Sequence, residues 1–266
     1  MNQMKTIIKK AGILYMALSF GLTSCETFDF GQEMGQKVIC IISDDDLVFT
    51  GMHDLNEPES TGYISVNCGG SLHIDRDVEV VMEYSPEVLA QYNKSKYDID
   101  EEKYAKELDS RYYTIPEMRV TLKASSADTY DTMPIRVRPE GLSPDSIYFI
   151  PLRIRSVSAY SVNPDKSQVL YRVYMKNLYA RSDEASIYNA TGTTQKDGEN
   201  EVEAAASQTF HPLTKNTFRI FAGIKGYETD ADVIRKNGII VQVNEDHSLT
   251  MRPYDEDSIE VAPVDA

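Results

Sequence analysis

Short runs in which apolar and polar residues alternate recur along most of this chain. Successive side chains of a β-strand point to opposite faces, so a period of two marks a strand with one buried face. Segments rich in Gly, Pro, Asn, Asp and Ser separate the runs, as turns do. The strands expected in the first two thirds of the chain are residues 37–43, 62–68, 78–84, 118–123, 133–138, 146–156 and 168–176.

Seven short strands with turns between them are typical of an immunoglobulin-like antiparallel sandwich. We place this sandwich at residues 36–180. Two segments inside it, 86–92 and 101–108, carry helix-forming residues and follow the plausible N-caps Ser85 and Asp100. The sequence therefore predicts a mostly β fold with short helical insertions.

The composition changes after Tyr179. Residues 181–208 are polar and rich in Gly, Thr, Asn and Glu, which predicts a hinge or mobile loops. Strand alternation resumes at 217–222 and continues in a hairpin within 238–254. We therefore expect residues 181–266 to form a C-terminal antiparallel β domain, either small or a truncated form of a larger one.

The N-terminus has the layout of a bacterial secretory signal, because three lysines precede an apolar run over residues 11–22. The run is too short to cross a bilayer, which takes about 20 apolar residues. It ends in Leu22-Thr23-Ser24-Cys25, which resembles the lipobox of bacterial lipoproteins. The resemblance implies that residues 1–25 are a signal peptide ending in a lipidated Cys25 and that residues 26–35 tether the protein to the membrane.

The chain is strongly acidic, with a formal net charge of -15. Removal of the signal would take away three lysines and no acid, so the mature chain is more acidic still. Such a surface repels the phosphates of nucleic acids and bare anionic lipid. A nucleic-acid partner is therefore not expected.

Two cysteines remain after the signal, Cys40 and Cys68. Each alternates with apolar neighbours, which predicts that both lie on the apolar face of a strand. A disulfide is permitted outside the cytoplasm, but two buried small hydrophobic side chains are the favoured interpretation. Neither belongs to a Cys-x-x-Cys pair, so no zinc or redox site is indicated.

The sequence carries no catalytic signature. Its four histidines have no metal-binding spacing and are near no nucleophile motif. The acidic clusters match no EF-hand pattern, and clusters of this kind are common in so acidic a chain. We therefore expect no enzyme activity, no metal and no cofactor.

Aromatic side chains are the candidates for carbohydrate contacts, since sugars stack on exposed rings. The chain has no Trp but has 17 Tyr and 8 Phe. Core packing is the alternative role for each of them. The rings in or near loops of the C-terminal region are Tyr188, Phe210, Tyr227 and Tyr254.

Alternation also places several arginines on one face of the expected strands. If those strands share a sheet, the arginines form a basic patch that suits carboxylate or sulfate groups of acidic sugars or an acidic partner. Cross-strand pairing with local Asp and Glu is the alternative. The residues are Arg136, Arg138, Arg153, Arg155 and Arg172.

Several short motifs occur together in the sandwich region. The most specific is Leu142-Ser143-Pro144-Asp145-Ser146 running into Tyr148-Phe149-Ile150-Pro151-Leu152, and Tyr113-Thr114-Ile115-Pro116 and Asn163-Pro164-Asp165-Lys166 accompany it. Together they resemble a family of Bacteroidetes surface lipoproteins of polysaccharide-utilisation loci. The resemblance implies an immunoglobulin-like N-terminal domain of unassigned function, also found ahead of glycoside hydrolase family 18 domains, and a second C-terminal β domain.

The resemblance also implies a setting. Members of the family are encoded beside starch-utilisation-type importers of the outer membrane. We therefore expect a lipid-anchored protein of the outer membrane and cell surface that binds glycan or assists polysaccharide capture beside such an importer. Its expected partners are the membrane, polysaccharide and importer proteins. The alternative is a structural or adhesive surface protein with no glycan affinity.

Overall fold

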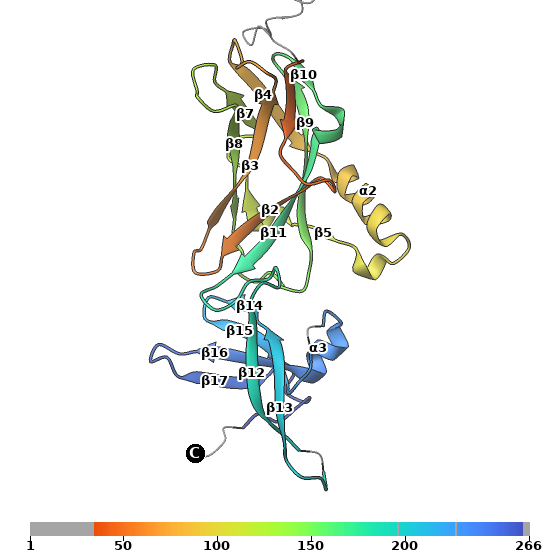
Figure 1. Cartoon of the computed structure of the whole chain (residues 1–266), viewed down its shortest axis with the longest axis vertical. Helices are drawn as coiled ribbons and strands as arrows, with labels where there is room; N and C mark the ends of the chain where they lie inside the picture. Colours follow the sequence, from red (N-terminus) through yellow and green to blue (C-terminus); the bar gives the residue numbers. More distant parts are fainter. Residues whose placement is uncertain (1–34, 196, 227, 263–266) are drawn as a thin grey trace, which may run out of the picture. The chain divides into compact units, whose positions relative to one another are not determined.

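The computed structural model describes residues 35–195, 197–226 and 228–262. Cys25, most of the predicted tether and Tyr227 lie outside these ranges, so their predicted roles stay predictions. The described residues form two sheets that pack as a sandwich, a two-stranded ribbon and a four-stranded sheet (Figure 1).

Each sheet of the sandwich collects strands from distant parts of the chain. The first sheet has the order β10 (Ser161–Val162), β1 (Val38–Ile41), β3 (Ser60–Gly69), β8 (Tyr130–Val137) and β6 (Tyr113–Thr114). The second has the order β2 (Val48–Asp54), β11 (Gln168–Lys176), β9 (Tyr148–Val157), β4 (Val78–Tyr84) and β7 (Arg119–Leu122), and β5 (Lys106–Glu107) pairs with one end of β9.

The predicted β-sandwich is confirmed, and most of its strand pairs are antiparallel. Three pairs are parallel instead: β1 with β10, β2 with β11, and β5 with β9. The chain changes sheets between β1 and β2, so β2 runs beside β11 rather than folding back on β1. Strand β2 was not predicted, because Gly51 and the buried polar His53 interrupt the alternation of apolar and polar residues there.

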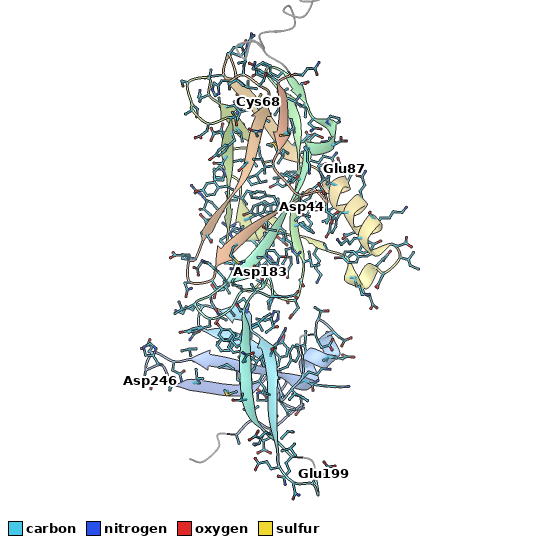
Figure 2. All side chains as sticks on the ribbon, viewed as in Figure 1. Asp44, Cys68, Glu87, Asp183, Glu199 and Asp246 are labelled. Atoms are coloured by element: carbon cyan, nitrogen blue, oxygen red, sulfur yellow. The ribbon has the colours of Figure 1, made fainter. Side chains whose placement is uncertain are left out.

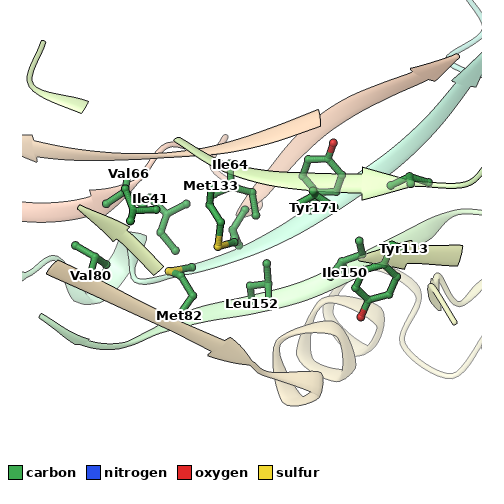
Figure 3. Packing of buried hydrophobic residues seen from close by; sticks show 14 of the residues in the cluster. Ile41, Ile64, Val66, Val80, Met82, Tyr113, Met133, Ile150, Leu152 and Tyr171 are labelled. Atoms are coloured by element: carbon green, nitrogen blue, oxygen red, sulfur yellow. The ribbon is translucent and has the colours of Figure 1, made fainter. Parts of the chain in front are cut away.

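The core lies between the two sheets and comes from the inward side chains of both. Ile64 and Val66 of β3 and Met133 of β8 face Met82 of β4 and Leu152 of β9, and all are at most 2% exposed (Figure 3). Burying one such side chain stabilises the fold by about 1.5–3 kcal/mol. The alternation that predicted the strands is therefore the pattern that builds this core.

Helix α2 (Pro86–Tyr97) covers part of the outer face of the second sheet (Figure 1). It starts where predicted, with Pro86 at the first helical position, where its missing N–H costs nothing. Val88 and Leu89 pack against Phe149 of β9 and Leu170 of β11. This contact fixes the helix on the sheet.

The second predicted helix, over residues 101–108, is wrong apart from a short 3₁₀ turn at Glu101–Lys103. The backbone N–H groups of Lys106 and Leu108 donate to carbonyls of residues 147 and 149 at 2.8 Å each, which makes the segment a strand. Asn93 of α2 holds the preceding residue, since its amide bonds both the N–H and the C=O of Ala105 at 2.9 Å. Tertiary pairing therefore overrides local helix preference here.

Cys40 and Cys68 form no disulfide with each other, as the favoured interpretation predicted. The prediction that both face the core is wrong for Cys40, because Ile39 and Ile41 are the buried residues of β1. All four residues of β1 are apolar or cysteine, so alternation could not show which face is buried. Cys68 lies opposite Ile39 rather than Cys40 in the register of β1 and β3.

A buried histidine and tyrosine hydrogen-bond inside the sandwich. His53 of β2 and Tyr171 of β11 are fully buried, and His53 Nε2 lies 3.0 Å from the Tyr171 hydroxyl oxygen. The other ring nitrogen, Nδ1, lies 3.2 Å from the carbonyl oxygen of Ser60. Burial lowers the pKa of His53 to about 4, although the Ser60 carbonyl acts in the opposite direction. The imidazole is therefore neutral in the folded protein at neutral pH.

The stability of the protein is expected to fall as the pH drops from about 6.5 towards 4. Burial also lowers the pKa of His211 to about 4, so in this pH window the unfolded chain binds protons that the folded chain does not. Each of the two histidines should cost about 1 kcal/mol at pH 5.5 relative to pH 7.5. Urea denaturation at the two pH values measures this loss.

A matched control for the pH effect is His73, which is exposed. His73→Asn should keep the full pH dependence, whereas His53→Gln should remove about half of it. Equal unfolding midpoints at pH 7.5 and 5.5 for the unmodified chain would contradict the assignment.

The C-terminal region contains the ribbon and the four-stranded sheet. The predicted strands 217–222 and 238–254 are confirmed, and the predicted mobile loop over 181–208 is wrong because most of it forms the ribbon. The ribbon is built of small, polar and mostly exposed residues, so its sequence shows no alternation of apolar and polar residues.

The elements of the C-terminal region are β12 (Ile187–Thr194), β13 (Val202–Thr209), β14 (His211–Thr214), β15 (Thr217–Phe221), α3 (Ala231–Asn237), β16 (Gly238–Val243) and β17 (Leu249–Pro253). Neither α2 nor α3 is long and apolar enough to cross a membrane.

Candidate functional site

Three aromatic rings stack in a column in the C-terminal region. The rings of Tyr188 and Phe210 have centroids 4.0 Å apart and an interplanar angle of 25°. The rings of Phe210 and Phe218 are 4.5 Å apart at 12°. Phe218 is 6% exposed, whereas Tyr188 is 44% exposed. The column therefore runs from the small core of this region to a solvent-exposed tyrosine.

Local structure places the three rings. Tyr188 lies at the start of β12 opposite Gln208 of β13, so Phe210, two residues further along, projects on the same side. Phe218 is an inward residue of β15 and packs with Val241 of β16 and Ala180. Tyr188 and Phe210 were predicted as candidates but Phe218 was not, because an inward phenylalanine of a strand has the pattern of ordinary core.

Hydrogen bonds hold the Tyr188 ring and also Gln208, the residue that pairs with Tyr188 across the ribbon. The hydroxyl of Tyr188 donates to the carbonyl oxygen of Tyr179 at 2.8 Å. Gln208 is 3% exposed, and its amide donates to the carbonyl of Gly223 at 2.8 Å while its carbonyl accepts from the N–H of Phe221 at 3.3 Å. The Tyr188 ring is thus fixed by a stacked ring and by its own hydroxyl, and little entropy is lost when a ligand contacts it.

An exposed aromatic ring with a rigid backing can stack against a sugar. The face of the ring carries negative charge density, and the C–H groups on one face of a pyranose are apolar and weakly positive. The ribbon that carries Tyr188 is acidic towards its far end, where Glu199, Glu201 and Glu203 are exposed; Figure 2 labels Glu199. Its charge disfavours acidic polymers. The arrangement therefore suits a neutral sugar.

Tyr254, a further predicted ring, does not join this column. Its ring lies 5.9 Å from the guanidinium of Arg219, which projects from the other face of β15. Tyr254 is 39% exposed, and its N–H donates to the carbonyl of Gly238 at 2.8 Å. The structure thus brings Tyr188 and Phe210 together and leaves Tyr254 apart, while Tyr227 lies outside the described residues.

A largely buried ion pair, with Asp145 15% exposed, occupies that other face of β15. Arg219 is 0% exposed and makes a two-pronged contact with Asp145, with N···O distances of 2.5 and 2.6 Å. His211 is also 0% exposed, and after burial the charge of Arg219 is the next cause that lowers its pKa, opposed by Asp145. The Nε atom of Arg219 has no hydrogen-bond partner within the described ranges. These charged groups are structural.

The five predicted arginines do not form one basic surface. Arg136 lies on β8 of the first sheet and Arg138 directly follows that strand, whereas the other three lie on β9 and β11 in the second sheet. The prediction assumed a shared sheet, and hydrophobic alternation cannot show which strands are neighbours. The premise of a single patch is therefore wrong.

Most of these arginines also have acidic partners. Arg138 lies 3.0 Å from Glu59, and Arg153 lies 2.7 and 2.9 Å from Glu83 and Glu87. Arg172 instead lies over the ring of Tyr174, 4.3 Å from its centroid. Local neutralisation thus removes much of the positive charge that an acidic ligand would need.

The described part of the chain does not indicate a metal centre. Within residues 35–195, 197–226 and 228–262, no three His, Cys, Asp or Glu side chains are grouped to hold an ion.

Comparison with known proteins identifies two matching families of domains. One family model, for an N-terminal domain, matches residues 36–161, and another, for a C-terminal domain, matches residues 167–265. No curated protein sequence matches the chain.

Solved structures from Bacteroides share the fold. A protein of unknown function from Bacteroides ovatus is 18% identical with a TM-score of 0.63, over 83% of this chain and 74% of that one. A multidomain protein including DUF1735 from Bacteroides ovatus is 19% identical with a TM-score of 0.62, over 82% and 72%. An auxiliary nutrient binding protein from Bacteroides thetaiotaomicron is 17% identical with a TM-score of 0.56, over 80% and 74%.

Proposed function

Since this chain belongs to the two-domain Bacteroidetes family of polysaccharide-utilisation loci, we propose that it is a glycan-binding protein whose Tyr188 stacks against a neutral sugar. The observation that carries the proposal is the ring column of Tyr188, Phe210 and Phe218, which ends in an exposed and rigidly held tyrosine. Binding, not catalysis, is the proposed activity. An auxiliary nutrient binding protein has the same fold, which supports the proposal of binding.

We further propose that the protein is lipidated on Cys25, held at the outer membrane and exposed at the cell surface beside an importer. The lipobox at residues 22–25 supports the anchor, and several acyl chains make such an anchor durable. A binding site on a tethered protein raises the local concentration of a polymer near the importer. The proposed partners are the polysaccharide and the importer proteins.

Replacing Tyr188 with alanine is expected to weaken glycan binding by at least about tenfold. The substitution removes the exposed ring on which the sugar stacks, and loss of about 1.4 kcal/mol corresponds to a factor of ten in the dissociation constant. Tyr188→Phe keeps the ring and should stay within about threefold. Isothermal titration with a polysaccharide that retains the unmodified protein in affinity gels measures both constants.

The matched control for this substitution is Tyr130→Ala. Tyr130 is 48% exposed, close to the value for Tyr188, but no described ring stacks behind it. This variant should bind like the unmodified protein. Equal loss of affinity in the two variants, or none in Tyr188→Ala, would argue against the ring column as the binding site.

Replacing Cys25 with alanine is expected to release the protein from the membrane fraction. Without a thiol at this position no acyl chain can be attached, and the short apolar run over residues 11–22 cannot span a bilayer. Fractionation and metabolic labelling with a radioactive fatty acid measure the change. A labelled, membrane-bound Cys25→Ala protein would show that the anchor lies elsewhere.

A further inference from the structure

A cavity of about 250 Å³ opens on the outer face of the second sheet, between helix α2 and the loop that leads into β2. Figure 2 labels Asp44 in this loop and Glu87 near the start of the helix. The floor of the cavity is apolar and includes Leu47 and Leu170. Gln91, Ser95 and Asp45 add polar groups at its walls. None of these residues belongs to the column of Tyr188, Phe210 and Phe218.

The loop side of the cavity is held by several hydrogen bonds. The N–H of Leu47 donates to the carbonyl of Asp44 at 3.2 Å, and the N–H of Val48 donates to the Asp44 carboxylate at 2.7 Å. The carbonyl of Leu47 accepts from the N–H of Leu170 on β11 at 2.8 Å. The loop is thus tied both to itself and to the sheet.

The helix side is held as well. The ring of Tyr92 packs edge-on against Phe149, with centroids 5.1 Å apart. Lys96 lies 3.1 Å from Asp46 and joins the helix to the loop. This ion pair is exposed and contributes little to stability, so the hydrogen bonds of the loop and the packing of Tyr92 on Phe149 are what hold the two walls. The cavity therefore exists before any ligand arrives.

Leu47 has a left-handed backbone conformation, with φ of 63°. A branched side chain in this region costs about 1–2 kcal/mol, and glycine or asparagine is the usual residue there. The leucine places an apolar side chain in the floor of the cavity, which neither of those residues would do. Strain of this kind gathers at binding sites.

We propose that this cavity binds one neutral pyranose ring, as a second carbohydrate site separate from Tyr188. Its volume is below the roughly 300–1,000 Å³ of sites for drug-sized ligands, so it suits a single sugar unit. Lys96 Nζ lies over the Tyr92 ring, 6.0 Å from its centroid, so the apolar side chains of Leu47, Val88 and Leu170 are the part of the lining that matches the C–H surface of a sugar. Gln91 and Ser95 can donate to and accept from its hydroxyls, and Asp45 can accept from them. Lys96, which also lines the cavity, pairs with Asp46, and the further carboxylate of Asp45 disfavours an anionic sugar.

The test uses a chain that carries Tyr188→Ala, so that its result does not depend on the proposed platform. Saturation-transfer NMR is recorded with the methyl glycosides of glucose, galactose, mannose and glucuronic acid. At least one neutral glycoside is expected to receive saturation and to bind more tightly than the glucuronide. In the same background, Gln91→Ala/Ser95→Ala should weaken that neutral ligand by about tenfold or more, since two hydrogen-bonding groups are lost.

The control is Lys94→Ala on the same helix, because Lys94 is exposed and does not line the cavity. Alanine is a strong helix former, so all three substitutions should leave α2 folded. The control should keep the affinity of the background chain. The proposal is overturned if no neutral glycoside binds, or if Gln91→Ala/Ser95→Ala and Lys94→Ala bind alike. Either outcome leaves the proposal for Tyr188 intact, because that residue is absent throughout.

Discussion

Gly62→Ala is expected to destabilise the protein by about 3 kcal/mol, because a Cβ at this position would lie 1.8 Å from the hydroxyl oxygen of Tyr171. A Cβ added at Gly51, on the other sheet of the sandwich, would also lie 1.8 Å from this oxygen. The two glycines thus make the space that the buried tyrosine occupies. Alanine lowers the entropy of the unfolded chain by an amount worth only about 0.4–1 kcal/mol, so the clash decides the sign.

Two further substitutions separate this clash from a general intolerance of alanine. Gly69→Ala, in the same strand as Gly62, places its Cβ 3.8 Å from the nearest atom and should change stability by less than about 1 kcal/mol. Tyr171→Phe removes the hydroxyl oxygen. The nearest atoms to a Cβ at position 62 then lie at 3.1 Å, which the structure can absorb, whereas a Cβ at position 51 still meets the ring carbon at 2.3 Å.

Tyr171→Phe is therefore expected to rescue Gly62→Ala but not Gly51→Ala. Alone it should cost about 1–3 kcal/mol, since His53 Nε2 loses its partner. Urea denaturation of the single and double variants gives the coupling energies. A rescue of both glycine variants, or of neither, would contradict the described packing.

Asp145→Asn is expected to destabilise the protein by about 3–5 kcal/mol, because it leaves the charge of the fully buried Arg219 without compensation. Asp145 lies between β8 and β9 of the sandwich, and Arg219 lies on β15, so the loss should appear first in the C-terminal sheet. Thermal unfolding followed by limited proteolysis of residues 181–262 measures the effect.

Two comparisons isolate the buried charge. Glu79→Gln removes one of the two acidic partners of Arg119 at an exposed pair of equal length, 2.5 Å, and should cost less than about 1 kcal/mol. Replacing both buried partners by apolar residues, in Asp145→Leu/Arg219→Met, should recover much of the stability lost in Asp145→Asn. If Asp145→Asn costs no more than Glu79→Gln, the pair is not the buried contact described.

The sequence predicted the strands that carry one apolar face, and it missed the elements that lack one. β4 and β11 begin and end where alternation placed them, at residues 78–84 and 168–176. The exposed ribbon of β12 and β13 has no apolar face to recognise. β5 was predicted as helix because its pairing with β9 depends on residues 42 positions away, which local preference does not contain.

The candidate site was predicted only in part, because its complete arrangement also depends on pairing between distant residues. Tyr188 and Phe210 were found as aromatic residues near loops, but the stack needs Phe218, which only the register of β13, β14 and β15 brings beneath them. The grouping of five arginines failed because β8 belongs to the other sheet. The contact of Asp145 with Arg219 joins residues 74 positions apart, and no pattern within either segment predicts it.

Glycan binding by the intact mature chain is the central claim, and native affinity electrophoresis tests it most directly. The protein without residues 1–25 is run in gels that contain starch, mannan, galactomannan, xylan, polygalacturonate or chondroitin sulfate. We predict that at least one neutral polysaccharide retards the unmodified protein, that Tyr188→Ala reduces this retardation, and that the two acidic polymers do not retard it. Equal mobility in all gels and in a gel without polysaccharide would contradict the account and would favour a structural or adhesive role.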